Sequence, residues 1–384
     1  MKVLITGGAG FIAHHIIDKI LNETDWKVVC LDRLDFSGNL NRLHEILQNK
    51  PYARRVKIVY HDLKAELNDM ISHNIGQIDY IFHLAAGSHV NRSIENPLEF
   101  VYDNVVGTCN ILNFARKQKK LKKFVYFSTD EVFGPAEEGV KYKEWDRYNS
   151  TNPYSATKAG GEELALAFQN TYNLPIYITH TMNVFGERQH PEKFIPMCIR
   201  KVFKDQIVRI HSDAKLQKPG SRHYIHAKDV ADALLYIVNK NFPYIKYNFV
   251  GEEEVDNLQL AMAIAKVQKK ELKYQMMDFH SSRPGHDLRY SLDNSLMKKL
   301  GWMPKLNFSD RIEEVVNWYL KNPKWLMNEV EEEEYFESNF MVPPKNSNFL
   351  KSPQIDSLSN KFGGYVLNHE TGKIEGVKIL LDRN

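Results

Sequence analysis

Short apolar runs alternate with amphipathic stretches along the first 180 residues of the chain. The apolar runs are rich in β-branched and aromatic residues, as buried strands are. They predict strands over residues 2–6, 27–32, 56–60, 80–84, 123–128 and 175–181. Helical periodicity fills most of the gaps, notably residues 100–118 and 154–172. Strands that alternate with helices predict an α/β fold with a doubly wound, mostly parallel sheet.

The regular alternation of strands and helices ends at about residue 182. Beyond it the predicted loops are longer, and helical patterns occur at residues 192–203, 229–238 and 309–320. We therefore expect a first domain over residues 1–181 and a smaller α/β substrate-binding lobe over residues 182–328, interleaved with it. An extension of unknown role follows over residues 329–384. It holds an acidic run at 331–334, typical of a solvated linker, and a segment at 365–381 that could form a hairpin.

The composition of the chain excludes some classes of binding partner but says little about the fold. The net charge of +3 comes from interspersed acidic and basic residues, so there is no electrostatic case for nucleic acid or a membrane surface. The three cysteines lack metal-ligand spacing, and we expect no metal and a reducing compartment. No apolar run approaches the roughly 20 residues of a membrane span. The first strand begins at residue 2, which leaves no room for a signal peptide. These features together predict a cytoplasmic protein.

A glycine-rich turn directly follows the first predicted strand and opens a helix. Gly7 and Gly10 permit a tight turn and let a pyrophosphate approach the backbone amides at the helix N-terminus. Asp32 ends the second strand, where it can bind a ribose 2′-hydroxyl and repel a 2′-phosphate, although Arg33 beside it blurs that preference. Asp62 follows the third strand and could reach the adenine amino group. An ordinary strand–helix turn is the alternative, but the combination predicts NAD.

The candidate chemistry lies at the end of the fifth strand. Thr129, Asp130 and Glu131 follow that strand, and ligands of open α/β sheets sit outside the carboxyl ends of strands. Tyr154 and Lys158 lie four apart on one helix face, so the ammonium is expected to lower the phenol pKa from about 10. A base, an acid and a second base exceed what alcohol oxidation needs. Taken alone, the acidic pair could instead be a helix cap or a solvated pair.

These motifs resemble those of the extended short-chain dehydrogenase/reductase superfamily, and within it the nucleoside-diphosphate-glucose 4,6-dehydratases. The likeness runs from residue 1 to about 325, and the triplet Thr129-Asp130-Glu131 is its most specific part. Further stretches that carry it are residues 31–40, 83–90, 128–134, 152–158, 191–196 and 283–287. The resemblance implies a Rossmann-type fold and bound NAD. It also implies conversion of dTDP-glucose or UDP-glucose to the 4-keto-6-deoxy sugar by internal hydride transfer and loss of water.

The resemblance also implies roles for individual residues. Tyr154 would remove the proton of the glucose 4-hydroxyl, Glu131 the C5 proton, and Asp130 would protonate the departing 6-hydroxyl. Thr129 would hydrogen-bond the 4-oxygen, and the catalytic set includes Lys158. Asn104, on the predicted helix, could hold a water or the Lys158 amine. The expected cofactor-binding residues are Gly7, Gly10, Phe11, Ile12, Asp32, Asp62, Leu63, Ala85, Asn104, Tyr154 and Lys158.

Substrate contacts and assembly are predicted more loosely. Lys193 and Arg222 are candidates for the substrate diphosphate because cations grip phosphate oxygens, and surface charge is the alternative. Departures from the family pattern at Gly87, Asn91 and His223 leave the nucleotide base open. Family resemblance implies a homodimer through residues 100–118 and 154–172. The expected substrate-binding residues are Ser88, Asn183, Lys193, Arg222, Arg283 and His286. An epimerase or decarboxylase on the same fold, or a non-catalytic NAD-binding scaffold, are the alternative functions.

Overall fold

The computed structural model describes residues 1–35, 37–278, 288–327, 365–367 and 374–376. The chain forms two units, Met1–Met327 and Asn328–Asn384. In the second unit, β14 (Tyr365–Leu367) pairs antiparallel with β15 (Ile374–Gly376). Every predicted site residue belongs to the first unit.

A seven-stranded sheet of order β11-β6-β5-β4-β1-β2-β3 forms the centre of the first unit, and every neighbouring pair is parallel. The chain runs outward from β1 to β3, then returns to place β4 on the other side of β1. The prediction of a doubly wound parallel sheet is confirmed. The strands are β1 (Lys2–Thr6), β2 (Lys27–Asp32), β3 (Val56–Tyr60), β4 (Tyr80–His83), β5 (Lys123–Thr129), β6 (Ile176–Thr181) and β11 (Lys246–Phe249).

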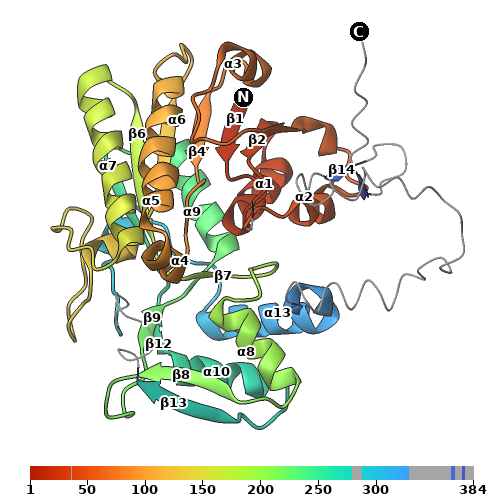
Figure 1. The fold of residues 1–384 in the computed structure, drawn as a ribbon, viewed down its shortest axis with the longest axis vertical. Helices are drawn as coiled ribbons and strands as arrows, with labels where there is room; N and C mark the ends of the chain where they lie inside the picture. Colours follow the sequence, from red (N-terminus) through yellow and green to blue (C-terminus); the bar gives the residue numbers. More distant parts are fainter. Residues whose placement is uncertain (36, 279–287, 328–364, 368–373, 377–384) are drawn as a thin grey trace, which may run out of the picture. The chain divides into compact units, whose positions relative to one another are not determined.

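Helices cover both faces of this sheet (Figure 1). Successive residues of β1 enter different cores, Val3 and Ile5 on one face and Leu4 on the other. On the first face pack α1 (Phe11–Glu23), α2 (Leu40–Leu47) and α9 (Ala227–Lys240). On the second pack α3 (Asp69–Ile75), α6 (Gly107–Ala115) and α7 (Pro153–Tyr172). Burial on both faces explains the apolar runs of the central strands, whereas the edge strand β3 is partly exposed.

The helix predicted over residues 100–118 is interrupted. It comprises α5 (Pro97–Val101), a π-helical turn η2 (Tyr102–Val106) and α6, and α4 (Val90–Glu95) precedes it. A π-helical turn widens the helix and changes the direction of its side chains. Here it buries the amide of Asn104, which a regular amphipathic pattern would not show.

The second lobe is smaller and is built on its own apolar cluster. Its two-stranded sheets are β8 with β13, which are parallel, and β9 with β12, which are antiparallel. Figure 1 shows α8, α10 and α13 gathered around β8 and β13. The bounds are α8 (Phe194–Phe203), β8 (Val208–Ser212), β9 (Ser221–His223), β12 (Glu254–Asp256), α10 (Asn257–Val267), β13 (Tyr274–Asp278) and α13 (Phe308–Lys321). The remaining elements are η1 (Ala53–Arg55), η3 (Asp130–Phe133), β7 (Val184–Phe185), β10 (Ile225–His226), α12 (Ser295–Lys299) and η4 (Pro323–Leu326).

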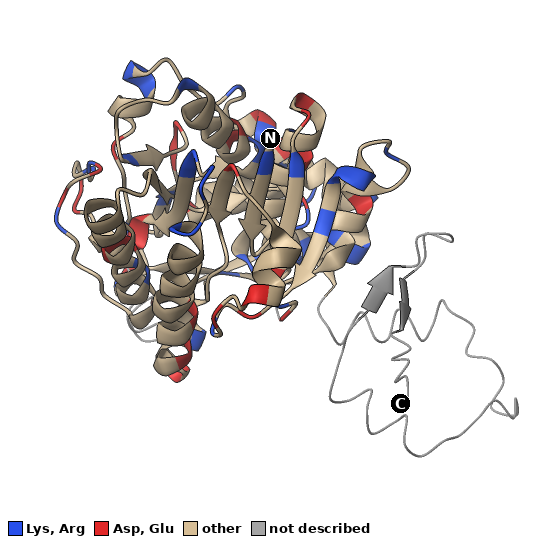
Figure 2. Cartoon of the chain, turned by 90° about the horizontal axis from the view of Figure 1, so that it is seen from above, with Lys and Arg blue, Asp and Glu red and all other residues tan. Residues whose placement is uncertain are grey.

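Charged side chains stand at the ends of several strands of the sheet (Figure 2). Several strands begin with a lysine, whereas β2 ends with Asp32 and β5 is followed by Asp130. The lysines are Lys2, Lys27, Lys123 and Lys246. The carboxyl ends of the strands are therefore where acidic side chains meet the cavity described below. In the part of the chain that the structure describes, no helix is long and apolar enough to cross a membrane.

Candidate active site

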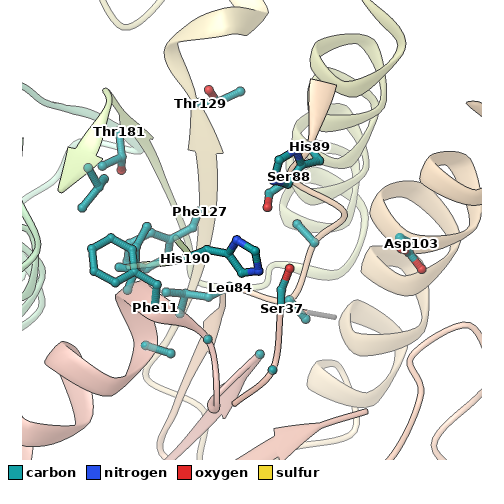
Figure 3. A pocket seen from close by; sticks show the side chains of 18 of the residues that line it. Phe11, Ser37, Leu84, Ser88, His89, Asp103, Phe127, Thr129, Thr181 and His190 are labelled. Atoms are coloured by element: carbon teal, nitrogen blue, oxygen red, sulfur yellow. The ribbon is translucent and has the colours of Figure 1, made fainter. Parts of the chain in front are cut away.

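A cavity of about 420 Å³ opens along the carboxyl ends of β1, β2, β4, β5 and β6 (Figure 3). Side chains from the glycine-rich turn, the end of β5 and the start of the second lobe all reach it. The predicted residues that line it are Gly7, Gly10, Phe11, Ile12, Asp32, Asp62, Leu63, Ala85, Ser88, Thr129, Asp130, Glu131, Tyr154, Lys158, Asn183 and Lys193. Sites predicted from separate stretches of sequence thus share one cavity.

Of the predicted residues that the structure describes, two do not line it. Asn104 lies behind the wall, and Arg222 lies on β9 with its guanidinium carbon 4.6 Å from the centre of the Tyr290 ring. Arg222 is nevertheless close enough for its charge to lower the pKa of both Asp130 and Glu131. Arg283 and His286 lie outside the described residues.

The glycine-rich turn has the geometry that a dinucleotide needs. Gly7 has φ +66°, and a Cβ there would lie 2.9 Å from the Ala85 backbone. A Cβ on Gly10 would lie 2.8 Å from the Gly7 carbonyl oxygen. Gly10 caps α1 without any side-chain bond to the first amides, so these point toward the cavity as an anion-binding end. The donors, and the acidic Asp32 on the next strand, fit the pyrophosphate and ribose of NAD.

Asn104 holds the wall of the cavity together. Its Oδ1 accepts from the Gly87 amide at 2.8 Å, and its Nδ2 donates to the Gly87 carbonyl at 3.1 Å and to Thr157 Oγ1 at 3.0 Å. The amide therefore joins the loop after β4 to α7. Of the two expectations for Asn104, the Lys158 amine is corrected, because that amine donates to the Phe127 carbonyl instead. A water held by Asn104 stays a prediction.

Lys158 donates through Nζ to the Phe127 carbonyl at 2.5 Å and lies 4.3 Å from the centre of the Tyr126 ring. Burial lowers the pKa of Lys158 to about 7, although Glu162 opposes the shift. The pKa of Tyr154 is raised, first by burial and then by the charge of Glu131, while a hydrogen bond with Thr129 opposes this. The prediction that Lys158 lowers the Tyr154 pKa is therefore wrong for the protein without its cofactor. The Lys158 ammonium is turned toward a carbonyl of β5, and the net shift of the Tyr154 pKa is upward.

The acidic pair is held by a short 3-10 turn directly after β5. Thr129 caps this turn, since its Oγ1 accepts from the Glu131 amide at 3.3 Å and donates to Asp130 Oδ1 at 3.0 Å. Burial raises the pKa of Asp130 to about 6. Burial and then the charge of Asp130 raise the pKa of Glu131 to about 7. Two carboxyl groups that exchange protons near neutral pH thus lie beside the Tyr154 phenol.

Asn152 contacts the acidic pair, and the sequence interpretation did not predict this contact. Its Oδ1 accepts from the Ser155 amide at 2.9 Å and starts α7, and its Nδ2 donates to Glu131 Oε2 at 3.1 Å. The Asn-Pro pair is a helix-start signal, so the cap was predictable. The contact with Glu131 spans 21 positions, and no local pattern shows it. His89 and His190, also unpredicted, line the cavity and are labelled in Figure 3.

A fully buried carboxylate, Glu162 of α7, lies behind the catalytic turn. It accepts from the hydroxyls of Ser128 and Tyr148 and from His180 Nε2 at 3.1 Å. The ammonium of Lys246 is 3.6 Å from the same carboxylate. Burial alone raises the pKa of Glu162, but His180, Lys246 and Ser128 together hold it below its usual value. In the described part of the chain, no group of three acidic, histidine or cysteine side chains is placed to hold a metal.

Comparison with known proteins points in one direction. The model of the GDP-mannose 4,6 dehydratase family matches residues 4–315. A dTDP-glucose 4,6-dehydratase of Escherichia coli is 34% identical over 354 residues, covering 85% of this chain and 95% of that protein. A trifunctional UDP-glucose 4,6-dehydratase/UDP-4-keto-6-deoxy-D-glucose 3,5-epimerase/UDP-4-keto-L-rhamnose-reductase of Arabidopsis thaliana is 35% identical over 329 residues, covering 84% of this chain and 48% of that protein.

Solved structures agree with the sequence comparisons. DesIV, a dTDP-glucose 4,6-dehydratase from Streptomyces venezuelae whose structure holds NAD, superposes with a TM-score of 0.75 at 30% identity. The match covers 85% of this chain and 98% of DesIV. It therefore includes both the sheet and the second lobe of the first unit.

Proposed function

The chain belongs to the GDP-mannose 4,6 dehydratase family, and from that premise we propose that it is an NAD-dependent 4,6-dehydratase of a nucleoside-diphosphate glucose. The substrate is dTDP-glucose or UDP-glucose, and the product is the 4-keto-6-deoxy sugar nucleotide. The observation that carries the proposal is the buried pair Asp130 and Glu131 beside Tyr154. Removing water requires an acid and a base in addition to the groups that handle oxidation.

NAD, when bound, supplies a reversible hydride acceptor, so that oxidation and reduction cancel over one turnover. Gly7, Gly10 and the first turn of α1 would hold its pyrophosphate, and Asp32 a ribose hydroxyl. The Asp32 carboxylate is already oriented, because its oxygens accept from the Ala9 and Leu34 amides at 2.9 and 2.8 Å. Leu63 and Ala85 line the same part of the cavity.

Tyr154 is the proposed base for the sugar 4-hydroxyl. Burial and the charge of Glu131 raise its pKa, so the phenol needs a nearby positive charge to act as a base. Thr129, which hydrogen-bonds with the phenol, is placed to orient it and to hold the 4-oxygen. Lys158 lies on the same helix face, and the positive charge of a bound nicotinamide would favour the phenolate.

Glu131 and Asp130 are the proposed base and acid of the elimination. A 4-ketone acidifies the C5–H bond, and Glu131 with a pKa of about 7 can accept that proton near neutral pH. Asp130, whose pKa is raised to about 6, can donate to the departing 6-hydroxyl. Asp130 Oδ2 has no hydrogen-bond partner among the described residues, so it is open to a substrate hydroxyl.

The substrate diphosphate is proposed to lie at the lobe side of the cavity. Lys193 precedes α8 and lines the cavity together with Asn183 and Ser88. Arg222 would add a second cation, since its charge already acts on the acidic pair. Arg283 and His286 remain predicted contacts of the nucleotide end.

We further propose a homodimer in the cytoplasm. The face formed by α4, α5 and η2 carries exposed apolar side chains, among them Leu98 at 62% and Tyr102 at 47% exposure. A second copy packing there and on α7 would bury them. Light scattering on wild type and on Leu98→Glu tests this, and an unchanged dimer in the variant, or a monomeric wild type, would refute this interface.

The decisive test of function is product analysis without added NAD. Full-length protein is incubated separately with dTDP-glucose and UDP-glucose, and products are identified by NMR and mass spectrometry. Loss of one water from one substrate, with no net reduced cofactor, is the expected result and identifies the nucleotide. A product of unchanged mass with an inverted 4-hydroxyl would show an epimerase instead. No conversion of either substrate, with NAD also added, would remove the dehydratase proposal.

A further inference from the structure

Arg33 is placed where it could change the choice of cofactor. It directly follows Asp32, and both side chains line the same end of the cavity as Asp62. An arginine fork is the group that binds a phosphate in two-point contact. At this position it would meet the 2′-phosphate of NADP, and Asp32 alone would favour the 2′-hydroxyl of NAD.

The fork of Arg33 is already occupied by another part of the chain. Nη1 donates to Asp103 Oδ1 at 2.6 Å, and Nη2 donates to Asp103 Oδ2 at 2.9 Å. Its Nε donates to Asp35 Oδ2 at 2.5 Å. The Asp103 side chain is only 7% exposed, so this two-point ion pair is largely shielded from water. These contacts use every nitrogen of the guanidinium.

The surrounding charges disfavour an added phosphate as well. Asp62 Oδ1 lies 3.6 Å from Arg33 Nη1. The nearby cation Lys64 is 3.4 Å from Asp103 Oδ1 and 3.1 Å from Glu99 Oε1. A dianionic phosphate would therefore enter a region in which carboxylates outnumber cations, and in which Arg33 and Lys64 are already paired with carboxylates. The third cation there, Arg42, donates to the carbonyls of Arg188, Ala9 and Ser37.

We propose that Asp103 is a cofactor-specificity residue, which sequesters Arg33 so that the site accepts NAD and rejects NADP. Asp103 lies on the π-helical turn η2, and the adjacent Asn104 points to the wall beside α7. The turn thus sends one side chain to the adenosine end and the next toward the catalytic helix. The inference rests on the dinucleotide requirement of the proposed dehydratase and deepens it.

The test measures binding rather than turnover. Full-length protein is loaded with NADH, whose fluorescence reports occupancy, and NAD or NADP is titrated as the competitor. For Asp103→Asn, the ratio of NADP to NAD dissociation constants should fall roughly 10- to 100-fold, the worth of a released charge-assisted pair. Most of the change should come from tighter NADP binding. In Asp103→Asn combined with Arg33→Ala the ratio should return to within about threefold of the wild-type value, inside the usual spread of such measurements.

Matched variants separate the outcomes. Glu99→Gln, which removes the other partner of Lys64 without touching Arg33, should leave the ratio unchanged. An unchanged ratio in Asp103→Asn, or a fall that persists without Arg33, would overturn the proposal. If Asp103→Asn does not fold, Asp35→Asn decides in the same way with a smaller expected fall. Failure of the dehydratase proposal would instead appear as absent product while both dinucleotides still titrate.

Discussion

Two buried acidic regions lie on either side of the end of β5, and they are built in opposite ways. One region is the pair Asp130 and Glu131, and the other is Glu162. Neighbouring hydroxyls bind them, since Thr129 donates to Asp130 and Ser128 donates to Glu162. Glu162 also has Tyr148, His180 and Lys246 around it. Asp130 and Glu131 have fewer donors and no directly paired cation among the described residues.

The pKa values follow this difference in partners. Burial pushes all three carboxyl groups toward the neutral form, but only Glu162 has enough donors and positive charge to reverse the shift. Glu162 therefore stays ionised and anchors α7 to the sheet. The pKa values of the cavity pair, raised to about 6 for Asp130 and about 7 for Glu131, lie near the neutral range in which acid–base chemistry works. The carboxyl groups proposed as catalysts are thus the ones whose neighbours leave them incompletely satisfied.

We expect the largest effect on activity from Glu131→Gln. Removing the elimination base should lower kcat roughly 10²- to 10⁴-fold, with the oxidation step preserved. The near-ultraviolet absorbance of reduced nicotinamide should then accumulate on the enzyme when sugar nucleotide is added. Glu137→Gln, an exposed carboxylate in the following loop, is the control and should behave as wild type. Normal product formation by Glu131→Gln would remove that residue from the mechanism.

Glu162→Gln should act first on stability. The change leaves Lys246 and His180 buried without their carboxylate, and breaking such a buried pair costs about 3–5 kcal/mol of unfolding free energy. Urea unfolding measures the loss, with the exposed neighbour Glu163→Gln as the matched control. The comparison fails if Glu162→Gln unfolds like wild type, or if Glu131→Gln is the more destabilised of the two.

The two regions should also respond to pH in opposite directions. The folded-state pKa of Glu131, about 7, lies above its usual 4.5, so this group favours folding most at low pH and that contribution is lost as pH rises through about 7. The folded-state pKa of Glu162 is lowered, so its contribution is present above the usual value and is lost as pH falls. Unfolding measured between about pH 5 and pH 8 should therefore show Glu131→Gln gaining relative to wild type as pH rises. The deficit of Glu162→Gln should stay constant over that range and shrink only when the pH falls below the usual glutamate value of 4.5. A deficit of Glu162→Gln that does not shrink below that pH, or a Glu131→Gln curve parallel to wild type between about pH 5 and pH 8, would contradict the assignment.

We expect the smallest effects from substitutions of Asn152, which contacts Glu131 and caps α7. Asn152→Ala loses both the α7 cap and the donor to Glu131, at a cost of about 1 kcal/mol for the cap. Asn152→Ser keeps a cap and loses only the donor. Its unfolding free energy should match wild type, while the acidic limb of its kcat profile, set by ionisation of Glu131, moves to higher pH. A profile identical to wild type in both variants would show that the Asn152 amide does not tune Glu131.

The strands and the location of the cavity could be predicted because they depend on local patterns. β1 and β2 contain continuous apolar runs, and the glycines of the turn stand close together in the sequence. The π-helical turn and the orientation of Lys158 could not be predicted in this way. They depend on contacts such as Asn104 with Thr157, 53 positions away, and Arg33 with Asp103, 70 positions away. The Tyr154 pKa was predicted in the wrong direction for the same reason. The spacing from Lys158 does not show that burial and the charge of Glu131 raise this pKa.

The π-helical turn at Tyr102–Val106 has a consequence for how this chain can change over generations. Such a turn contains one residue more than the α-helical turn it replaces, so deleting a single codon would restore a regular helix. That one event would rotate Asp103 and Asn104 together, releasing Arg33 and detaching the loop at Gly87 from α7. A single insertion or deletion in this turn would therefore change both the proposed choice of cofactor and the support of α7.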